Sequence, residues 1–313
     1  MKAFIFDPLW DNLISNELLS KLKNNGIEIT VTTEIAPLKK CKALFEGKEN
    51  RILCINPDYV NWKLPSEDYQ NIPNLKAILG AATSSSWIDS SYANSKQIPI
   101  CNIRNFSTEA VAEWSITMMF NVARQIPRLI KDGFPLDYGK DFMKYRGLEL
   151  HHKTVGIIGL GNIGAAIAKK CEGLGMNVVY WSRSPKNTKY QRVELKELFS
   201  TSDVIFPTIA INYETKKVVT TQLLKSMKPS AMLISVVHEL FDQETVLNMV
   251  KDGKLFGFGF ESEPASFNKY QGNVWAAPAY AWVTNSSMNN SMTKWVENMI
   301  HAKNNTFPNK ITE

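Results

Sequence analysis

Short apolar runs alternate with amphipathic segments along the first hundred residues of the chain. A segment at 17–23 has apolar residues at helical spacing and stops at Asn25-Gly26. The apolar runs typical of buried strands lie at 3–6, 27–31, 52–55 and 77–79. Strands that are separated by helical segments predict a parallel sheet with crossover helices.

A second alternation of this kind fills residues 153–277. Strands are predicted at 153–158, 176–181, 204–206, 231–237, 255–260 and 274–277, with helices at 165–171, from Thr221, and at 242–250. This pattern predicts a second doubly wound domain. A last helix at 291–302 follows the completed sheet, and we expect it to return to the first domain.

A long helix is predicted to begin at Thr108, between the two alternations. Its apolar residues fall at helical spacing: Val111, Trp114, Met118, Val122 and Ile126. Met119 and Phe120 widen the apolar surface, so we expect this helix to be buried on more than one side. Such a helix suits a link between domains, a dimer contact or simple core packing.

A glycine motif follows the strand at 153–158. Gly159, Gly161 and Gly164 have the spacing G-x-G-x-x-G, and a helix begins directly after them. The first glycine permits a tight turn, the second lets a pyrophosphate approach the backbone, and the third lets helix and strand pack closely. Because strands flank the motif on both sides, it predicts a dinucleotide site whose phosphates bind at the helix N-terminus, beside Asn162 and Ile163.

The end of the next strand indicates which dinucleotide binds. An NAD site usually has an acidic residue there, which accepts hydrogen bonds from the ribose hydroxyls. Here Ser182 takes that place, and Arg183 and Ser184 follow. A carboxylate would repel a 2′-phosphate, whereas a hydroxyl and a guanidinium donate hydrogen bonds to it. The sequence therefore predicts NADPH over NADH as the cofactor.

Composition excludes several other classes of protein. The net charge is +6, but the Lys and Arg residues are dispersed, so we expect no nucleic-acid partner. No apolar run approaches the ~18 to 20 residues of a membrane span. The first residues resemble a strand and not a signal peptide, so we expect a cytoplasmic protein that does not bind membranes. The cysteines show no C-x-x-C spacing, and we expect reduced thiols and no metal.

Several segments, in this order along nearly the whole chain, resemble the D-isomer-specific 2-hydroxyacid dehydrogenases. They are NLKAI at 74–78, IPICN at 98–102, FSTEAVAE at 106–113, the glycine motif, MKP at 227–229 and ESEP at 261–264. The resemblance implies an α/β protein with two doubly wound parallel-sheet domains. These are a flavodoxin-like substrate domain of residues 1–102 and 286–313 and a Rossmann NAD(P)-binding domain of residues 103–285.

The same resemblance implies the chemistry and the assembly. It implies hydride transfer between a nicotinamide and a small 2-oxo or 2-hydroxy acid, and a homodimer built partly through the helix near Thr108. Thr208 and Thr215 are expected among the cofactor contacts. The family's substrate-binding turn contains glycine, whereas this chain has Ser84, Ser85, Ser86 and Trp87 in that place. The serines offer hydroxyl donors, and Trp87 is expected to narrow or reshape the pocket.

The family's catalytic residues are an arginine, a histidine and a supporting glutamate, and this chain lacks the first two. The arginine position falls on His238, or on Val237 if the loop slips, and the sequence has no arginine after Arg192. The histidine position, after Pro278, holds Ala279. Reduction of a 2-oxo acid requires a cation near the carboxylate and an acid for the developing alkoxide, so the loss concerns the chemistry directly.

The retained position of the triad is a glutamate, with Glu263 as the first candidate. Glu261 is either its rival or the acidic residue that in this family usually faces the nicotinamide. Other residues offer compensation. His238 is a candidate acid, Arg104 a candidate cation and Tyr280 a candidate proton donor. Each also has a simpler interpretation, as a loop histidine, a surface charge and a packed aromatic residue.

Two functions follow from these observations. The first is an NAD(P)-dependent oxidoreductase, with NADPH favoured, acting on a 2-oxo or 2-hydroxy acid or a related carbonyl compound with a non-standard active site. The second is a catalytically impaired NADP(H)-binding protein with a regulatory or assembly role. Loss of two groups that act as a unit motivates the second.

Overall fold

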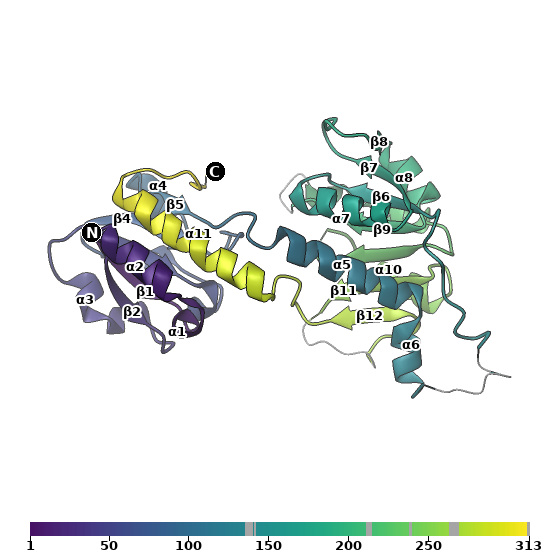
Figure 1. Ribbon diagram of the computed structural model, residues 1–313, viewed down its shortest axis with the longest axis horizontal. Coiled ribbons are helices and arrows are strands. Elements are labelled where there is room, and N and C mark those ends of the chain that lie inside the picture. The colour runs from purple at the N-terminus through teal and green to yellow at the C-terminus, as the bar shows by residue number, and fades with distance from the viewer. Residues whose placement is uncertain (135–139, 141, 211–214, 238–239, 263–268, 312–313) are drawn as a thin grey trace. The chain divides into compact units, whose positions relative to one another are not determined.

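The computed structural model describes residues 1–134, 140, 142–210, 215–237, 240–262 and 269–311. The chain divides into two units, Met1–Ser107 with Thr284–Glu313, and Thr108–Val283 (Figure 1). The sequence placed the domain boundaries after residue 102 and before residue 286. Each unit has its own parallel sheet, and the two sheets are described in turn.

The first unit is built on five parallel strands in the order β2-β1-β3-β4-β5. This is the flavodoxin-like strand order, as predicted. The strands are β1 (Lys2–Phe6), β2 (Glu28–Thr32), β3 (Arg51–Ile55), β4 (Leu75–Gly80) and β5 (Ile100–Cys101). The α-helices are α1 (Trp10–Leu13), α2 (Asn16–Asn24), α3 (Lys42–Phe45), α4 (Ser91–Ser95) and α11 (Asn285–Lys303), with short 3-10 helices η1 (Leu38–Lys40), η2 (Pro57–Val60) and η3 (Ser66–Asp68).

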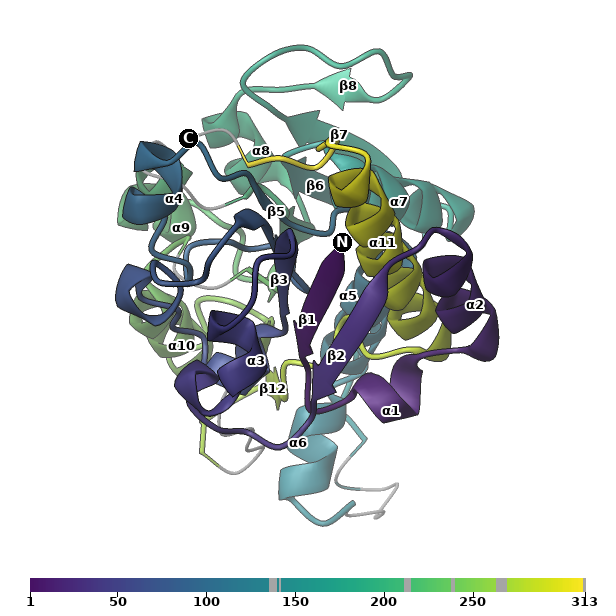
Figure 2. The ribbon, with the colours of Figure 1, turned by 90° about the vertical axis from the view of Figure 1, so that its left-hand side faces the viewer.

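Side chains alternate between the two faces of this sheet, and helices cover both faces (Figure 2). On β1, Ala3 and Ile5 belong to the hydrophobic cluster that includes residues of α2 and α11. Phe4 and Phe6 point to the other side, where α3 and α4 pack. Because both faces are buried, the strands are apolar along most of their length, as is usual for parallel sheets.

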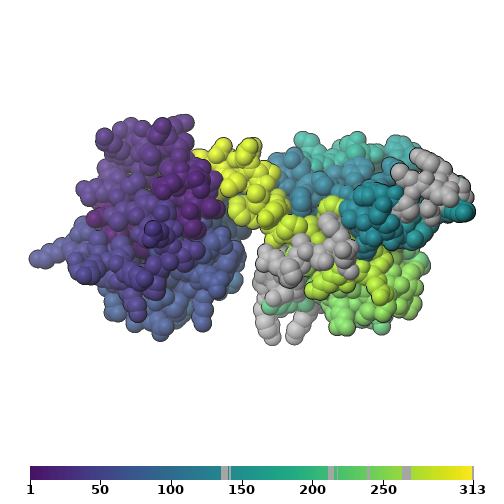
Figure 3. Space-filling model, turned by 90° about the horizontal axis from the view of Figure 1, so that it is seen from below, coloured from purple at the N-terminus to yellow at the C-terminus, as the bar shows by residue number. Residues whose placement is uncertain are grey.

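The last helix returns to the first unit, as the sequence predicted. Helix α11 begins at Asn285, earlier than the predicted 291. Trp295 is fully buried, donates from Nε1 to the Leu79 carbonyl at 2.9 Å, and packs edge-on against Trp10. In the space-filling view the yellow atoms of this segment lie directly against the purple atoms of the first elements (Figure 3).

The second unit has a sheet of seven parallel strands in the order β12-β11-β10-β9-β6-β7-β8. With β6 as the first strand of the unit, this is the Rossmann order, as predicted. The strands are β6 (Thr154–Ile158), β7 (Asn177–Trp181), β8 (Gln191–Arg192), β9 (Val204–Pro207), β10 (Met232–Ser235), β11 (Gly257–Glu261) and β12 (Val274–Ala277). The helices are α5 (Thr108–Ala123), α6 (Ile126–Lys131), α7 (Asn162–Gly173), α8 (Leu195–Thr201), η4 (Thr215–Lys217), α9 (Thr221–Lys225) and α10 (Gln243–Lys251).

The long helix predicted from Thr108 is divided into α5 and α6. Gln125 has a φ of 53°, a left-handed conformation that ends a helix. Pro127 lies in the first turn of α6, where its missing N–H leaves no helical bond unmade. Ile126 therefore begins a new helix and does not continue the α5 stripe. Phe120, counted among the buried residues, is 40% exposed.

Helices also cover both faces of the second sheet. Val155 and Ile157 belong to the cluster with α5 and α7, and Ile158 belongs to the cluster with α8, α9 and α10. Among the described residues no helix combines the length and apolar character that a membrane crossing requires.

Candidate active site and cofactor-binding site

The glycine turn between β6 and α7 has the geometry of a dinucleotide-binding loop. Gly159 has a φ of 96°, which an L side chain rarely adopts. A Cβ built on Gly159 would lie 2.2 Å from the Ile209 Cγ2, and one on Gly164 would lie 2.2 Å from the Gly159 carbonyl oxygen. These two glycines therefore serve the turn and the close approach of helix to strand, as the motif predicts.

Gly161 has a different role from its neighbours in the motif. A Cβ on Gly161 would meet nothing within 4 Å, and its φ of −86° is ordinary for any residue. It is the N-cap of α7 and offers no side chain to the first N–H groups of the helix. Asn162 and Ile163 follow at the first positions, with Asn162 exposed. Open space in front of a helix N-terminus is the place where a pyrophosphate binds.

The two threonines predicted as cofactor contacts are both engaged with the backbone. Thr208 follows β9 and donates its hydroxyl to the Gly159 carbonyl at 2.6 Å, which links β9 to the glycine turn. Thr215 is buried and donates its hydroxyl to the Ala210 carbonyl at 2.8 Å. A hydroxyl has one proton to donate, so in this conformation Thr208 positions the glycine turn and does not donate to a phosphate.

The end of β7 carries the residues expected to select the cofactor. Ser182 is 6% exposed and donates its hydroxyl to the Ser184 carbonyl at 2.5 Å. Arg183 and Ser184 are exposed. Arg192 from β8 donates from Nε and Nη2 to the Ser182 carbonyl at 3.1 and 3.0 Å. The guanidinium of Arg192 therefore lies beside Ser182, at the end of β7, where NAD sites usually have an acidic residue.

Arg192 was not among the residues predicted for the cofactor site. It lies ten residues beyond Ser182, and it returns to that residue because β8 pairs with β7, with Arg192 opposite Tyr180. The available signal was the short run from Tyr190 to Val193, which precedes helix α8. A two-residue strand has too little periodicity to be recognised in the sequence.

Of the two candidate glutamates, Glu261 lies within the described residues and is buried at the carboxyl end of β11. Its Oε1 accepts a hydrogen bond from the Ala281 N–H at 2.8 Å, which fixes the turn after Pro278. Tyr280 lies in that turn and is 59% exposed. The carboxylate of Glu261 and the segment that lacks the histidine are therefore adjacent. Glu263 and His238 lie outside the described residues.

The predicted substrate loop follows β4 in the first unit. Ser84 and Ser86 are exposed, and their hydroxyl oxygens are 3.1 Å apart. Trp87 is 7% exposed, lies 3.1 Å from where a Cβ on Gly80 would be, and donates from Nε1 to the Ser84 carbonyl at 2.8 Å. The effect of Trp87 on a substrate pocket stays a prediction, and the structure adds a role within the first unit. The indole packs into the core of its own unit and holds the loop, because burial of a large aromatic residue is strongly favourable.

A hydrogen-bonded chain connects Arg104 to this loop. Arg104 donates from Nε to the Asn102 Oδ1 at 3.1 Å, and Asn102 donates from Nδ2 to the Thr83 carbonyl at 2.6 Å. The Asn102 carbonyl in turn accepts from Asn298 at 2.9 Å. Asn102 is thus a positioning residue that sequence reasoning missed, and it connects the Arg104 guanidinium to the loop at Thr83.

Asp7, which sequence reasoning also missed, lies at the carboxyl end of β1. It is 1% exposed, and its Oδ1 accepts hydrogen bonds from the Leu9 N–H at 3.0 Å and from Asn56 at 2.8 Å. Burial raises the pKa of the Asp7 carboxyl, and those two hydrogen bonds partly oppose the rise. The available signal was its place at a strand end, next to the point where the strand order reverses.

No group of three or more His, Cys, Asp or Glu side chains among the described residues is arranged to hold a metal ion. The hydrogen-bond donors described above include backbone N–H groups at the start of α7, the hydroxyls of Ser84 and Ser86, and guanidinium groups. Such a set suits phosphates and carboxylates.

Known proteins with similar sequences and structures agree with this arrangement. Residues 116–281 match the family model for the NAD-binding domain of the D-isomer-specific 2-hydroxyacid dehydrogenases. The chain is 30% identical over 247 residues to a glycerate dehydrogenase of Methylorubrum extorquens, which covers 75% of this chain and 78% of that protein. It is 28% identical over 265 residues to a glyoxylate reductase of Thermococcus gammatolerans, which covers 79% and 78% of the two chains.

A solved structure extends the likeness to the whole chain. An acyclic imino acid reductase in complex with NADPH and D-Arg superimposes with a TM-score of 0.81, at 24% identity, over 100% of both chains. The family model covers more than half of the residues, and the glycerate dehydrogenase matches across both units. The chain therefore belongs to the D-isomer-specific 2-hydroxyacid dehydrogenases.

Proposed function

We propose that the protein is an NADPH-dependent reductase that acts on a 2-imino acid, formed from a 2-oxo acid and an amine. One observation carries the proposal. A complete dinucleotide loop is combined with a sequence that has no arginine after Arg192 and has Ala279 at the family's histidine position. The cofactor framework is kept, while the groups that activate a ketone are replaced.

The choice of NADPH rests on the end of β7. Ser182 offers no negative charge, and the guanidinium groups of Arg183 and Arg192 are both near it in the chain or in space. Two cations, with a neutral residue in place of the usual carboxylate, favour a 2′-phosphate, to which arginine donates paired hydrogen bonds. The acyclic imino acid reductase of similar fold was solved with NADPH, which supports the same choice.

The substrate carboxylate is assigned to the first unit. Arg104 supplies the positive charge that the family takes from its missing arginine, and Ser84 and Ser86 supply hydroxyl donors. Asn102 restrains the guanidinium through the Arg104 Nε, which reduces the entropy lost on binding. The carboxylate is thus held without any residue after position 192.

The missing acid is explained by the chemistry of an imine. When bound, NADPH supplies a hydride to C2 of the substrate. A protonated imine accepts that hydride at carbon while the C=N π electrons move to nitrogen, and the neutral amine results without a further proton. A ketone instead yields an alkoxide, which needs a proton donor in the transition state. A site without the histidine therefore suits the imine better than the ketone.

The experiment compares one 2-oxo acid, pyruvate, with and without ammonium. We expect NADPH oxidation to require ammonium and to form alanine. If the protein reduces the ketone itself, lactate forms without ammonium. His238 and Tyr280 are then the candidate donors of the proton that the alkoxide needs. His238→Ala then lowers lactate formation. Equal rates of lactate formation with and without ammonium, and no alanine, would contradict the imine proposal.

Replacing Arg104 by glutamine tests the carboxylate assignment. A hydrogen bond to a charged group contributes about 1.5 to 3 kcal/mol, so KM for the 2-oxo acid at fixed ammonium should rise by about 10- to 100-fold. The Kd of NADPH should not change. Lys76→Gln is the matched control, since Lys76 is an exposed cation of β4 outside the loop. An unchanged KM in Arg104→Gln would remove Arg104 from the site.

A second candidate function is NADP(H) binding without catalysis. The absence of the arginine and the histidine favours it, because removing groups that act as a unit usually abolishes turnover. It shares the cofactor site with the first proposal. The two differ in one respect, which is whether hydride ever leaves the bound cofactor.

We also propose that the protein is a homodimer through α5. Phe120 is 40% exposed on this half-buried helix and offers an apolar contact to a second copy. Sedimentation should give twice the chain mass of 35.4 kDa, and Phe120→Ser should shift the equilibrium toward monomer. A monomeric wild-type protein at micromolar concentration would contradict this assembly.

The proposed compartment is the cytoplasm. All four cysteines are free thiols, and three of them are buried. Burial raises the pKa of Cys101 to about 11 and that of Cys171 to about 12, so both are protonated and inert. Unpaired, unreactive thiols are usual where the environment is reducing.

A further inference from the structure

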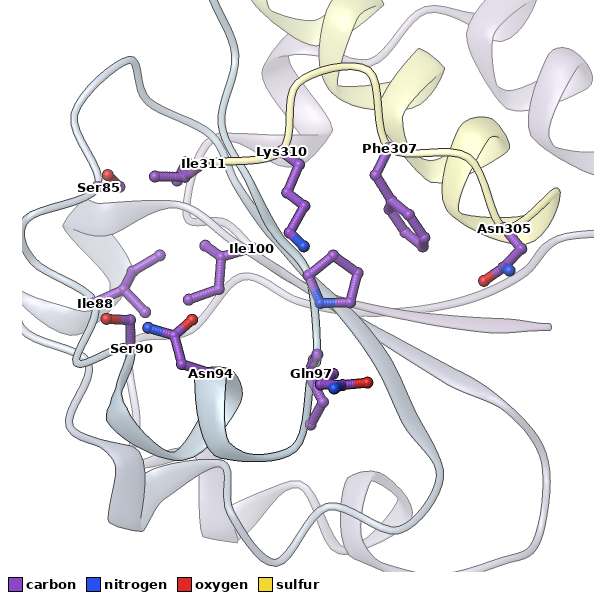
Figure 4. A pocket seen from close by; sticks show the side chains of 12 residues that line it. Ser85, Ile88, Ser90, Asn94, Gln97, Ile100, Asn305, Phe307, Lys310 and Ile311 are labelled. Carbon is purple, nitrogen blue, oxygen red and sulfur yellow. The ribbon is translucent and has the colours of Figure 1, made fainter. Parts of the chain in front are cut away.

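The first unit contains a cavity of about 540 Å³ that the proposed reaction does not use. It lies between α4 with the start of β5 and the segment that follows α11 (Figure 4). This volume is within the range of small-molecule sites in proteins. Ile88, Ile100 and Phe307 line its apolar part, and Asn94, Gln97 and Lys310 are among its polar lining.

The segment after α11 forms one wall of the cavity and is held in place by backbone hydrogen bonds. The Ile311 N–H donates to the Ile100 carbonyl at 2.9 Å, and the Asn102 N–H donates to the Asn309 carbonyl at 3.3 Å. Asn309 also donates from Nδ2 to the Asn298 Oδ1 at 2.9 Å. The wall is therefore part of the folded unit, and the cavity is preformed.

The described lining of the cavity includes one charged residue. Lys310 is the single ionisable side chain among the described lining residues, and Asp89 lies in the chain between two of them, Ile88 and Ser90. The Lys310 Nζ has no hydrogen bond or ion pair with any residue in the described part of the chain. Figure 4 shows its side chain pointing away from the C-terminal segment, toward the part of the cavity that Ile100 and Asn94 line. Half of the described lining residues are apolar, and an ammonium group beside them favours an anion with an apolar body.

The same cavity contacts the predicted substrate loop. Ser85 lines it, and Ile88 both lines it and donates its N–H to the Ser85 carbonyl at 2.9 Å. The same loop presents Ser84 and Ser86 and is held to Asn102 through the Thr83 carbonyl. A molecule in the cavity would therefore contact the loop at Ser85 and Ile88.

We propose that this cavity is a binding site for a small carboxylate with an aliphatic body, and that its occupancy restrains the substrate loop. Lys310 holds the carboxylate, and the isoleucines with Phe307 cover the aliphatic part. The proposal that a carboxylate binds here depends only on the cavity and its lining. The effect of binding on turnover rests on the proposed function, because only a loop that binds substrate can transmit it to KM.

The test of binding is a titration of the full chain with hexanoate, with hexan-1-ol as the uncharged probe, followed by amide NMR. Shifts are expected at residues 85–89 and 98–101, and not at the glycine turn 159–164. Lys310→Gln should weaken hexanoate binding by about three- to fivefold and leave hexan-1-ol unchanged. Ile311→Ala should weaken both probes, by about fivefold. Lys40→Gln removes the same charge from an exposed residue outside the cavity and should change neither.

Two results would overturn the proposal. One is the absence of shifts at 85–89 and 98–101 at saturating hexanoate, and the other is equal hexanoate affinity in Lys310→Gln and wild type. The effect of hexanoate on KM is a separate measurement. Hexanoate should change KM for the 2-oxo acid in both proteins, but in Lys310→Gln the change should need about three- to fivefold more hexanoate. Competition at the active site would instead show the same dependence on hexanoate concentration in the wild type and the variant. If the protein has no turnover, the proposed function fails, while the titration still shows whether the cavity binds hexanoate.

Discussion

Replacing Ser182 by aspartate should shift the ratio of the NADPH and NADH dissociation constants toward NADH by at least about 100-fold. An aspartate at the end of β7 accepts hydrogen bonds from ribose hydroxyls, and the same charge repels a 2′-phosphate. Each of these effects involves a charged group and is worth about 1.5 kcal/mol or more, which is about tenfold in affinity. Fluorescence titration with both nucleotides measures the ratio.

Ser182→Asn is the matched control for this change. Asparagine has the shape of aspartate without the charge, and both remove the hydroxyl that donates to the Ser184 carbonyl. The loss of that hydrogen bond should therefore affect both variants equally, and a shift seen only in Ser182→Asp belongs to the charge. A wild-type protein that prefers NADH, or an unchanged ratio in Ser182→Asp, would contradict the assignment of this position.

Replacing Gly161 by alanine should leave the fold intact and weaken NADPH binding by about tenfold or more. The φ of −86° suits alanine, and a Cβ there meets no protein atom within 4 Å, so the free energy of unfolding should change by less than about 0.5 kcal/mol. The added methyl group instead occupies the space through which a pyrophosphate approaches the N–H groups of α7. Urea denaturation and nucleotide titration measure the two effects.

Gly164→Ala provides the opposite outcome within the same motif. Its Cβ would lie 2.2 Å from the Gly159 carbonyl and 2.7 Å from the Thr208 hydroxyl. Because the carbonyl is backbone, helix α7 has to move, and overpacking of this kind costs about 1 to 3 kcal/mol of stability. If Gly161→Ala binds NADPH as well as the wild type does, the pyrophosphate does not bind at this turn.

The sequence predicted the sheets well because parallel strands buried on both faces are apolar along most of their length. The run from Phe4 to Phe6 and the glycine turn at 159–164 are examples, since each pattern has one physical solution. The division of the long helix was missed. Apolar spacing continues through Ile126, whereas the break depends on Gln125 adopting a left-handed φ, which few residues other than glycine signal.

The residues of the candidate site were predicted less completely, because long-range pairing positions several of them. Arg192 reaches Ser182 through a two-residue strand, and Asn102 connects Arg104 to the loop after β4. Neither relation has a local pattern. Trp87 shows the reverse case, since its position in the loop suggested a pocket residue, while its size favours burial in the core. His238 and Glu263 remain candidates from the sequence alone.

The transfer of deuterium from NADPH labelled at C4 of the nicotinamide tests the central claim most directly. The wild-type protein is incubated with the 4R- or the 4S-labelled cofactor, a panel of 2-oxo acids, and ammonium, and the products are analysed by mass spectrometry. The account predicts deuterium at C2 of a 2-amino acid, from one of the two labelled cofactors. NADPH bound tightly, with no labelled product from any member of the panel, would contradict it and leave a binding protein without catalysis.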